Sequence, residues 1–215
     1  MMKSFFSKIK KILFDYDAAL KAIKKEKGIK HAFWYLIVFL LFTQFFMVFY
    51  YSEVSLPKAG FAIDLSVEMF LVIYIITLAV LVGFTFLRPW LTNLFVKLFQ
   101  KKAVFADTYK VMVYGASPGY VVTPFFVGFM MGIVFLPKTG LWLLVLALLG
   151  VISLAGLIYE WILRVKGMMK IHKISVWPAI LCLYVFPLLL LILIEVVLVL
   201  LFVGLLASQG YFPVV

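Results

Sequence analysis

The sequence predicts an all-α protein: a polytopic membrane helix bundle with five transmembrane helices and additional interfacial amphipathic helices. Long apolar runs and the positions of the positive charges predict this class. Of the 215 residues, 67% are hydrophobic and 13% are charged, whereas soluble domains are about 25% charged. Each run is long enough to cross a hydrocarbon core of about 30 Å as a helix. The runs cover residues 32–51, 67–87, 111–135, 141–163 and 179–206.

The positive charges give these runs an orientation. If residues 1–31 lie in the cytoplasm, 18 of the 20 Lys and Arg residues share that side, and only Lys58 and Lys138 lie opposite. Cytoplasmic loops carry such an excess of Lys and Arg. We therefore expect a multi-pass protein of the cell membrane with a cytoplasmic tail (1–31) and an external tail (207–215). The net charge of +11 then faces anionic lipid headgroups, and we expect no nucleic-acid binding.

Two segments outside the runs have amphipathic patterns. Residues 1–31 carry apolar side chains at helical spacing with Lys between them, which predicts a helix lying flat on the cytoplasmic leaflet and ending near Gly28. Residues 88–102 predict a second interfacial helix, because Pro89 suits a first turn. Its apolar face would carry Trp90, Leu91, Leu94, Phe95 and Leu98, and its polar face Thr92, Asn93, Lys97 and Lys101. Such helices either anchor the bundle or provide a wedge or docking surface.

The third run differs from the others in its small residues and prolines. Glycines four apart let another backbone approach, and each proline removes a helix hydrogen bond and bends the helix. The fourth run offers Gly150, Ser153 and Gly156 as a matching face, so we expect these two spans to pack closely in the bundle centre. The candidate packing motif is Gly115, Pro118, Gly119, Pro124, Gly128 and Gly132.

Glu195 is the ionisable residue nearest the middle of a run. A charge there costs a few kcal/mol, so its side chain is expected to face the bundle interior. Gln44 and Tyr74 lie at nearly the same depth and are its expected partners. The three residues form either a hydrogen-bonded interhelical contact, which a single central carboxylate without an intramembrane Lys, Arg or His favours, or a proton or cation site. Glu160 is expected to pair with Arg164, four residues further along the same helix.

The stretch Gly115-Ala-Ser117-Pro-Gly119 fits the G-x-S-x-G pattern of serine hydrolases. A nucleophilic Ser needs a base within hydrogen-bond reach, and His172 is the candidate at a similar depth. Pro118 lacks the backbone N–H that would help to form an oxyanion hole. Small-residue packing explains the same pattern without catalysis. We expect no enzyme activity, metal site or cofactor, because the usual motifs for these are absent from the sequence.

Two stretches resemble the Yip family of five-span membrane proteins, named for interaction with Ypt/Rab GTPases. The first runs from Phe105 to Tyr109 and continues through Tyr114, Gly115 and Pro118. The second runs from Tyr159 through Gly167, His172, Lys173 and Ser175 to Ala179 and Pro187. The chain resembles the compact, prokaryotic type of member, because the long soluble N-terminal region of the eukaryotic branch has no counterpart here.

The resemblance implies a membrane-organising or protein-docking scaffold that is not an enzyme. Its partners would be the lipid bilayer with its anionic headgroups and, by the same resemblance, another membrane protein or a small GTPase. The main alternative is a small proton- or cation-coupled transporter or channel that uses Glu195. A remote alternative is an intramembrane serine hydrolase at Ser117.

Overall fold

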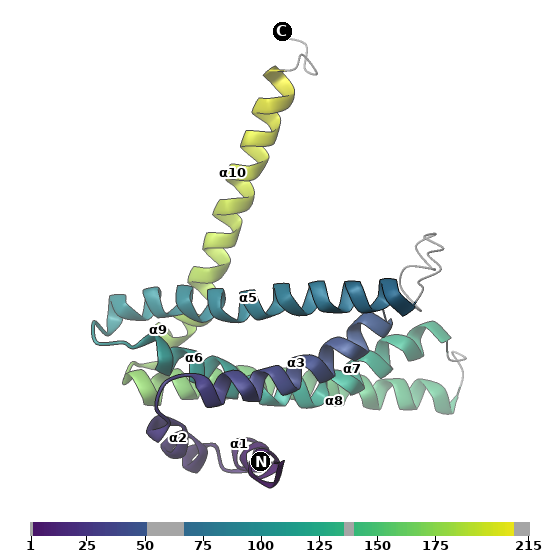
Figure 1. Cartoon of the computed structure of the whole chain (residues 1–215), viewed down its shortest axis with the longest axis horizontal. Coiled ribbons are helices and arrows are strands. Elements are labelled where there is room, and N and C mark those ends of the chain that lie inside the picture. Colours follow the sequence, from purple (N-terminus) through teal and green to yellow (C-terminus); the bar gives the residue numbers. More distant parts are fainter. Residues whose placement is uncertain (1, 51–66, 136–139, 209–215) are drawn as a thin grey trace.

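The computed structural model describes residues 2–50, 67–135 and 140–208, and every element it assigns in these ranges is helical (Figure 1). Within them, five helices are long and apolar enough to cross a membrane: Lys30–Met47, Leu71–Phe99, Phe105–Ile133, Leu141–His172 and Val176–Val199. This confirms the fold class predicted from the sequence.

The N-terminal tail forms two short helices, α1 (Met2–Phe14) and α2 (Tyr16–Lys25). The chain turns at Asp15, whose carboxylate accepts a hydrogen bond of 3.1 Å from the Ala18 amide and caps α2. The expectation that the tail's apolar face lies in lipid is wrong, because this face packs on the bundle. Its buried side chains are Ile12, Tyr16, Ala19, Leu20 and Ile23.

The tail leads through Gly28, at a φ of +65° that suits glycine, into α3 (Lys30–Tyr50). The next described helix, α5 (Val67–Phe99), is continuous through Pro89, so the expected separate interfacial helix over 88–102 is wrong. Most of the predicted apolar face stays on the outside of the bundle, but the Thr92 and Asn93 part of the predicted polar face is buried in it. Thr92 and Asn93 are 0% and 4% exposed, whereas the apolar Trp90, Leu94 and Leu98 are 51%, 41% and 71% exposed.

The third span consists of two helices, α6 (Phe105–Gly115) and α7 (Ser117–Phe135), which are interrupted at Ala116. The third span is therefore broken at Ala116 and is not the single bent helix that the sequence predicts. Pro118 has no amide hydrogen to donate to the Tyr114 carbonyl, four residues earlier. The Ser117 hydroxyl takes that place, with Oγ 2.6 Å from the Tyr114 oxygen. Pro124 lies inside α7 without a break.

The fourth span is α8 (Leu141–His172), and α7 packs along it more extensively than any other pair of described elements. The fifth span begins with α9 (Val176–Ile180), continues through a π-helical segment, η2 (Leu181–Val185), and ends as α10 (Phe186–Ser208). Figure 1 shows α3, α5, α7 and α8 running side by side, while α10 projects away from them.

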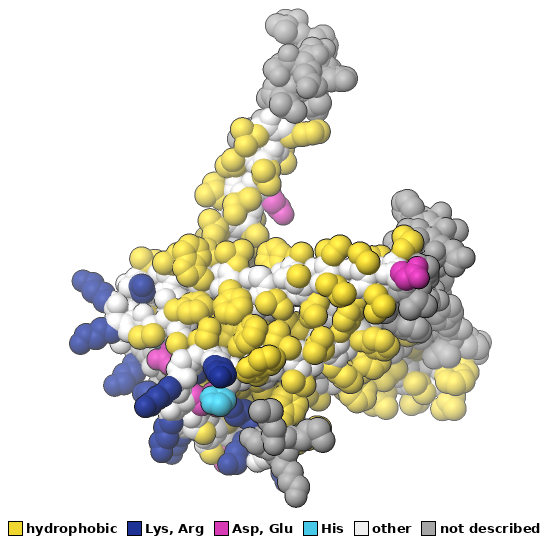
Figure 2. Space-filling view, viewed as in Figure 1, with side chains coloured by type: hydrophobic (Ala, Val, Ile, Leu, Met, Phe, Trp, Pro, Cys, Tyr) yellow, Lys and Arg dark blue, Asp and Glu magenta, His cyan; other side chains and the backbone are white. Residues whose placement is uncertain are grey.

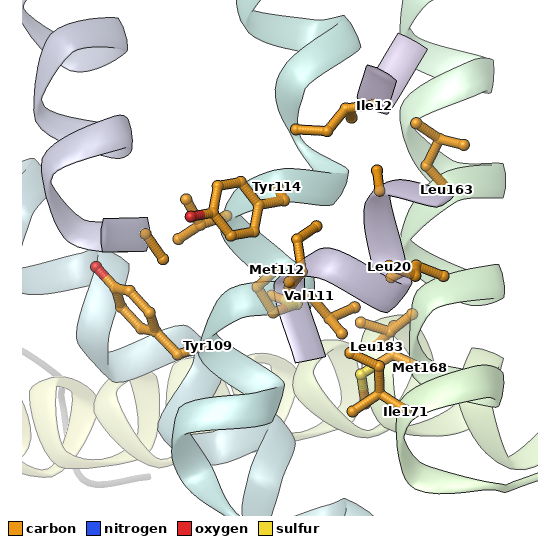
Figure 3. Close-up of a cluster of buried hydrophobic side chains, with 14 of the residues drawn as sticks. Ile12, Leu20, Tyr109, Val111, Met112, Tyr114, Leu163, Met168, Ile171 and Leu183 are labelled. Atoms are coloured by element: carbon orange, nitrogen blue, oxygen red, sulfur yellow. The ribbon is translucent and has the colours of Figure 1, made fainter. Parts of the chain in front are cut away.

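Buried side chains concentrate at one end of the bundle. Figure 2 shows that Lys and Arg gather at this end, and that hydrophobic side chains cover most of the rest of the face in view. We call the end with the buried side chains and the Lys and Arg residues the basic end. It comprises α1, α2, α6, α9, η2 and the adjoining ends of α3, α5 and α8. Figure 3 shows its core, in which Ile12 and Leu20 of the tail lie near Val111, Leu163 and Met168.

Candidate functional site

Glu26, just after α2, is the centre of a hydrogen-bonded group that holds the tail on the bundle. One carboxylate oxygen pairs with Lys8 of α1, and the other accepts a 2.8 Å hydrogen bond from the Tyr114 hydroxyl. Lys8 Nζ also donates to the Tyr114 oxygen at 3.0 Å and lies 4.7 Å from its ring centroid. This group joins α1, α2 and α6, and we call it the Glu26 clamp.

Lys110 of α6 caps the C-terminal end of α2 by donating to its last carbonyl groups. Its ammonium group donates to the Glu26 carbonyl at 3.1 Å and to the Ile23 carbonyl at 3.5 Å. The last carbonyls of a helix lack intrahelical donors, so a lysine here satisfies them. Lys110 is only 2% exposed, and Asp107 neutralises it at 2.8 Å.

The tail is also attached to α8. Asp17 accepts from Lys166 at 2.9 Å and from Lys170 at 2.7 Å, and the Tyr159 hydroxyl donates to the Leu13 carbonyl at 2.5 Å. The hydrogen bonds from Lys170 and then Lys166 lower the pKa of Asp17 below its ordinary value of 3.8. Because Asp17 is well exposed, water screens these pairs and each adds little stability.

A second buried polar group joins α5, α6 and α8. The Thr108 hydroxyl donates to Asn93 Oδ1 at 2.9 Å, and its oxygen lies 3.0 Å from His172 Nε2. Since a hydroxyl has one proton to give, His172 Nε2–H is the donor in the second bond. Thr108, Asn93 and His172 are 0%, 4% and 4% exposed. The two stretches that carry the family resemblance therefore meet here.

The small residues of the third span allow α6 and α7 to approach α8. A Cβ at Gly115 would lie 2.8 Å from Arg164 Cγ, and one at Gly119 would collide with the Glu160 carboxylate. Glu160 Oε1 is 2.6 Å from Arg164 Nη2, which confirms the expected pair. Gly115 thus lies against both the side chain and the backbone of Arg164, whereas Gly119 makes room for the Glu160 carboxylate.

The other glycines do not all share this role. A Cβ at Gly167 of α8 would lie 2.6 Å from the Tyr16 hydroxyl oxygen, so this glycine admits the tail. A Cβ at Gly156 of α8 would collide with the side chain of Val122 of α7. In contrast, a Cβ at Gly128 would have only an ordinary contact, 3.9 Å from Leu149. Gly132 is buried.

The structure does not bring Ser117 to a catalytic base. Its hydroxyl donates to the Tyr114 carbonyl and lies 2.8 Å from the Tyr35 hydroxyl, which must then be the donor. The imidazole Nε2 of His172 contacts Thr108 instead. The arrangement of Ser117 thus repairs the helix break that Pro118 causes. Two further residues of the family-like motif lie at helix ends. Lys173 is the C-cap of α8, at a φ of 55°, and Ser175 is the N-cap of α9.

The expectation that Glu195 faces the bundle interior is wrong in this structure, since its side chain is exposed on the projecting α10. Gln44 is 9% exposed on α3. The Tyr74 hydroxyl of α5 donates to the Leu41 carbonyl of α3 at 2.9 Å. Tyr74 thus bonds across the contact between α5 and α3, Gln44 is buried on α3, and Glu195 lies on another helix.

Together, these contacts among the described residues fix helices to one another. No group of three His, Cys, Asp or Glu side chains in the described ranges could hold a metal ion. Cys182 is buried in η2. The polar side chains of the basic end connect a folded tail to the bundle beneath it.

The fold and these contacts define a polytopic α-helical membrane protein with a tail packed on one end. The family model of the Yip1 domain matches residues 10–206, and the chain therefore belongs to the Yip family. The match begins within α1, so the domain includes most of the tail. Comparisons with curated proteins and with solved structures gave no match.

Sequence reasoning missed Glu26, Lys110 and Asn93 as contact residues. Glu26 and Lys110 appeared to be two more charges of the polar segments, and Asn93 a residue of a water-facing helix surface. One signal was present in the sequence: Asp107 lies three residues before Lys110, a spacing that lets a lysine be neutralised on its own helix.

Proposed function

We propose that this Yip family protein is a non-enzymatic membrane-organising or protein-docking scaffold whose docking surface is the tail on the basic end. The supporting observation is that most apolar side chains of α2 and the end of α1 pack on the bundle, although Phe6 and Phe14 stay exposed. Its exposed side is basic, and this outward face carries Lys10, Lys11, Lys21, Lys24, Lys25, Lys27 and Lys30. A rigid basic surface suits an acidic partner, which the family suggests is a small GTPase or another membrane protein.

We infer that this surface lies in the cytoplasm and that the C-terminus is external, in the cell membrane. The placement of 18 of the 20 Lys and Arg residues supports this orientation. A reporter fused after Val215 should be active outside the membrane. A cytoplasmic signal would contradict the five-span topology and the position of the docking surface.

Affinity capture of the full chain from native membranes, compared with two charge-reversal variants, tests the docking role. Lys21→Glu/Lys25→Glu alters the exposed face of α2, and Lys101→Glu is a control at an exposed basic residue outside the tail. The proposal predicts proteins that are captured by wild type and by the control and lost from the α2 variant. Equal capture by all three chains would contradict it.

Flux and activity assays separate the scaffold from its rivals. A transporter that uses Glu195 must give a pH-dependent flux in liposomes that Glu195→Gln abolishes. A serine hydrolase must react with an active-site-directed phosphonate in a way that Ser117→Ala prevents. The scaffold proposal expects neither result, and either one would overturn it.

A further inference from the structure

A cluster of charged and hydroxyl groups lies where α5, α7, α8 and η2 converge, and the contacts described so far do not explain it. α5 contacts η2, which carries Tyr184. Arg88 of α5 is exposed and has electrostatic interactions with Glu160 and Arg164 of α8 and with Tyr120 and Tyr184. Glu160 and Arg164 pair with each other, and their side chains are 12% and 11% exposed.

Arg88 leaves this cluster with one uncompensated positive charge. It stands within the apolar stretch Leu71–Phe99. None of the carboxylates in the described part of the chain forms a salt bridge with it. Around it on α5, Phe84, Leu87 and Trp90 are 58%, 46% and 51% exposed. An arginine in such apolar surroundings is costly without an anionic partner.

Two buried polar groups of the cluster also lack partners. Arg164 Nε and the Tyr184 hydroxyl have no hydrogen-bond partner among the described residues, although Arg164 is only 9% exposed. Both groups can donate to an anion. The Trp161 ring, which is 60% exposed, lies 5.3 Å from the Tyr184 ring. Exposed tryptophans of this kind mark the headgroup level of a bilayer.

We propose that this cluster binds the phosphate of an anionic phospholipid in the leaflet at the basic end, with Arg88 as the main ligand and Arg164 Nε and Tyr184 as further donors. A phosphodiester carries one negative charge, which balances the excess. Arginine recognises phosphate through paired N–H groups. The exposed apolar side chains beside Arg88 suit acyl chains and not a soluble anion. This site is separate from the docking role and does not depend on it.

Native mass spectrometry of the full chain in detergent, titrated with phosphatidylglycerol, tests the site. Arg88→Gln should weaken binding about tenfold or more, as expected for a lost charge-assisted bond. Lys97→Gln removes the same charge from an exposed position on the same helix and should stay within about twofold of wild type, since it lies outside the cluster. Glu160→Gln should tighten binding, because it removes the competing carboxylate. Equal binding by wild type and Arg88→Gln would overturn the proposal.

Two further arms identify the ligand. Inorganic phosphate at millimolar concentration should not displace the lipid, and phosphatidylcholine should bind more weakly than phosphatidylglycerol. Displacement by phosphate would indicate a soluble-anion site. Equal binding of both lipids, which share the phosphodiester, would contradict selection of a lipid with net negative charge. If Arg88→Gln fails to fold, Arg88→Lys keeps the charge and loses the paired geometry. The proposal then predicts a smaller lipid-induced rise in Tm than in wild type, and an equal rise would contradict it.

Discussion

The two ends of the bundle differ in what holds them together. At the basic end, the tail, α6 and α8 share a large apolar core and several buried hydrogen bonds that connect residues distant in sequence. The opposite end and α10 have mostly exposed apolar side chains, as in residues 188–199. Lipid can satisfy an apolar surface whatever its exact sequence, whereas buried polar groups need particular partners. The specific part of this molecule is therefore its basic end.

The largest expected effect of a single substitution comes from Gly119→Leu. The new side chain would displace Glu160 from Arg164 and push α7 from α8. We expect a loss of about 3 kcal/mol or a failure to fold, measured by thermal unfolding in detergent. Gly128→Ala is the matched control on the same helix and should be neutral or slightly stabilising. Equal stability of both variants would show that the packing around Gly119 is no tighter than that around Gly128.

Thr108→Val tests the buried group at the junction of α5, α6 and α8. The substitution keeps the shape of the side chain but leaves Asn93 and His172 without their shared partner. The expected loss is about 2 kcal/mol in the free energy of unfolding. Thr77→Val is the control, because Thr77 bonds only to carbonyls of its own helix, at 2.7 and 3.0 Å. A control that loses as much as Thr108→Val would contradict the special role of the junction.

Tyr114→Phe opens the Glu26 clamp by removing one hydroxyl. We expect about 1 kcal/mol less stability for tail docking, seen as faster proteolysis of residues 1–31 in detergent. Glu26→Gln should have a similar effect, and the double variant should lose less than the sum, since both residues share one network. Additive effects would show that the two side chains act independently.

The sequence predicted the span number and the approach of α6 and α7 to α8, because hydropathy and glycine spacing are local patterns. It failed wherever partners are far apart in the chain. The Tyr114–Glu26 hydrogen bond joins residues separated by 88 positions. An amphipathic helix also has the same pattern whether its apolar face meets lipid or protein. For this reason residues 1–31 were predicted to lie on the membrane surface, although their apolar face packs on the bundle. In residues 88–102 the error concerns the polar face, because Asn93 is buried against Thr108 of another helix.

The smallest expected effect concerns pH. Because the pKa of Asp17 is lowered in the folded state, its pairs with Lys166 and Lys170 stabilise docking at neutral pH. This contribution is lost as the pH falls below 3.8 and through the lowered pKa. Proteolysis of the tail by an acid-active protease should accelerate across that range in wild type. In Asp17→Asn the rate of tail proteolysis should show no such rise with falling pH. An identical rise in both chains would mean that other titrating groups cause it.

The most direct measurement of the central claim, that the tail is part of the bundle, is a photo-cross-link from position 14. Phe14 is 81% exposed yet borders an apolar groove of about 380 Å³ with Pro118, Val122, Gly156 and Tyr159. A benzophenone side chain at this position should cross-link within the chain to peptides 118–122 or 155–159 in lipid bilayers. The same probe at the outward-facing Lys21 should not. Cross-links from position 14 to lipid alone would contradict the account and restore a tail that lies flat on the membrane.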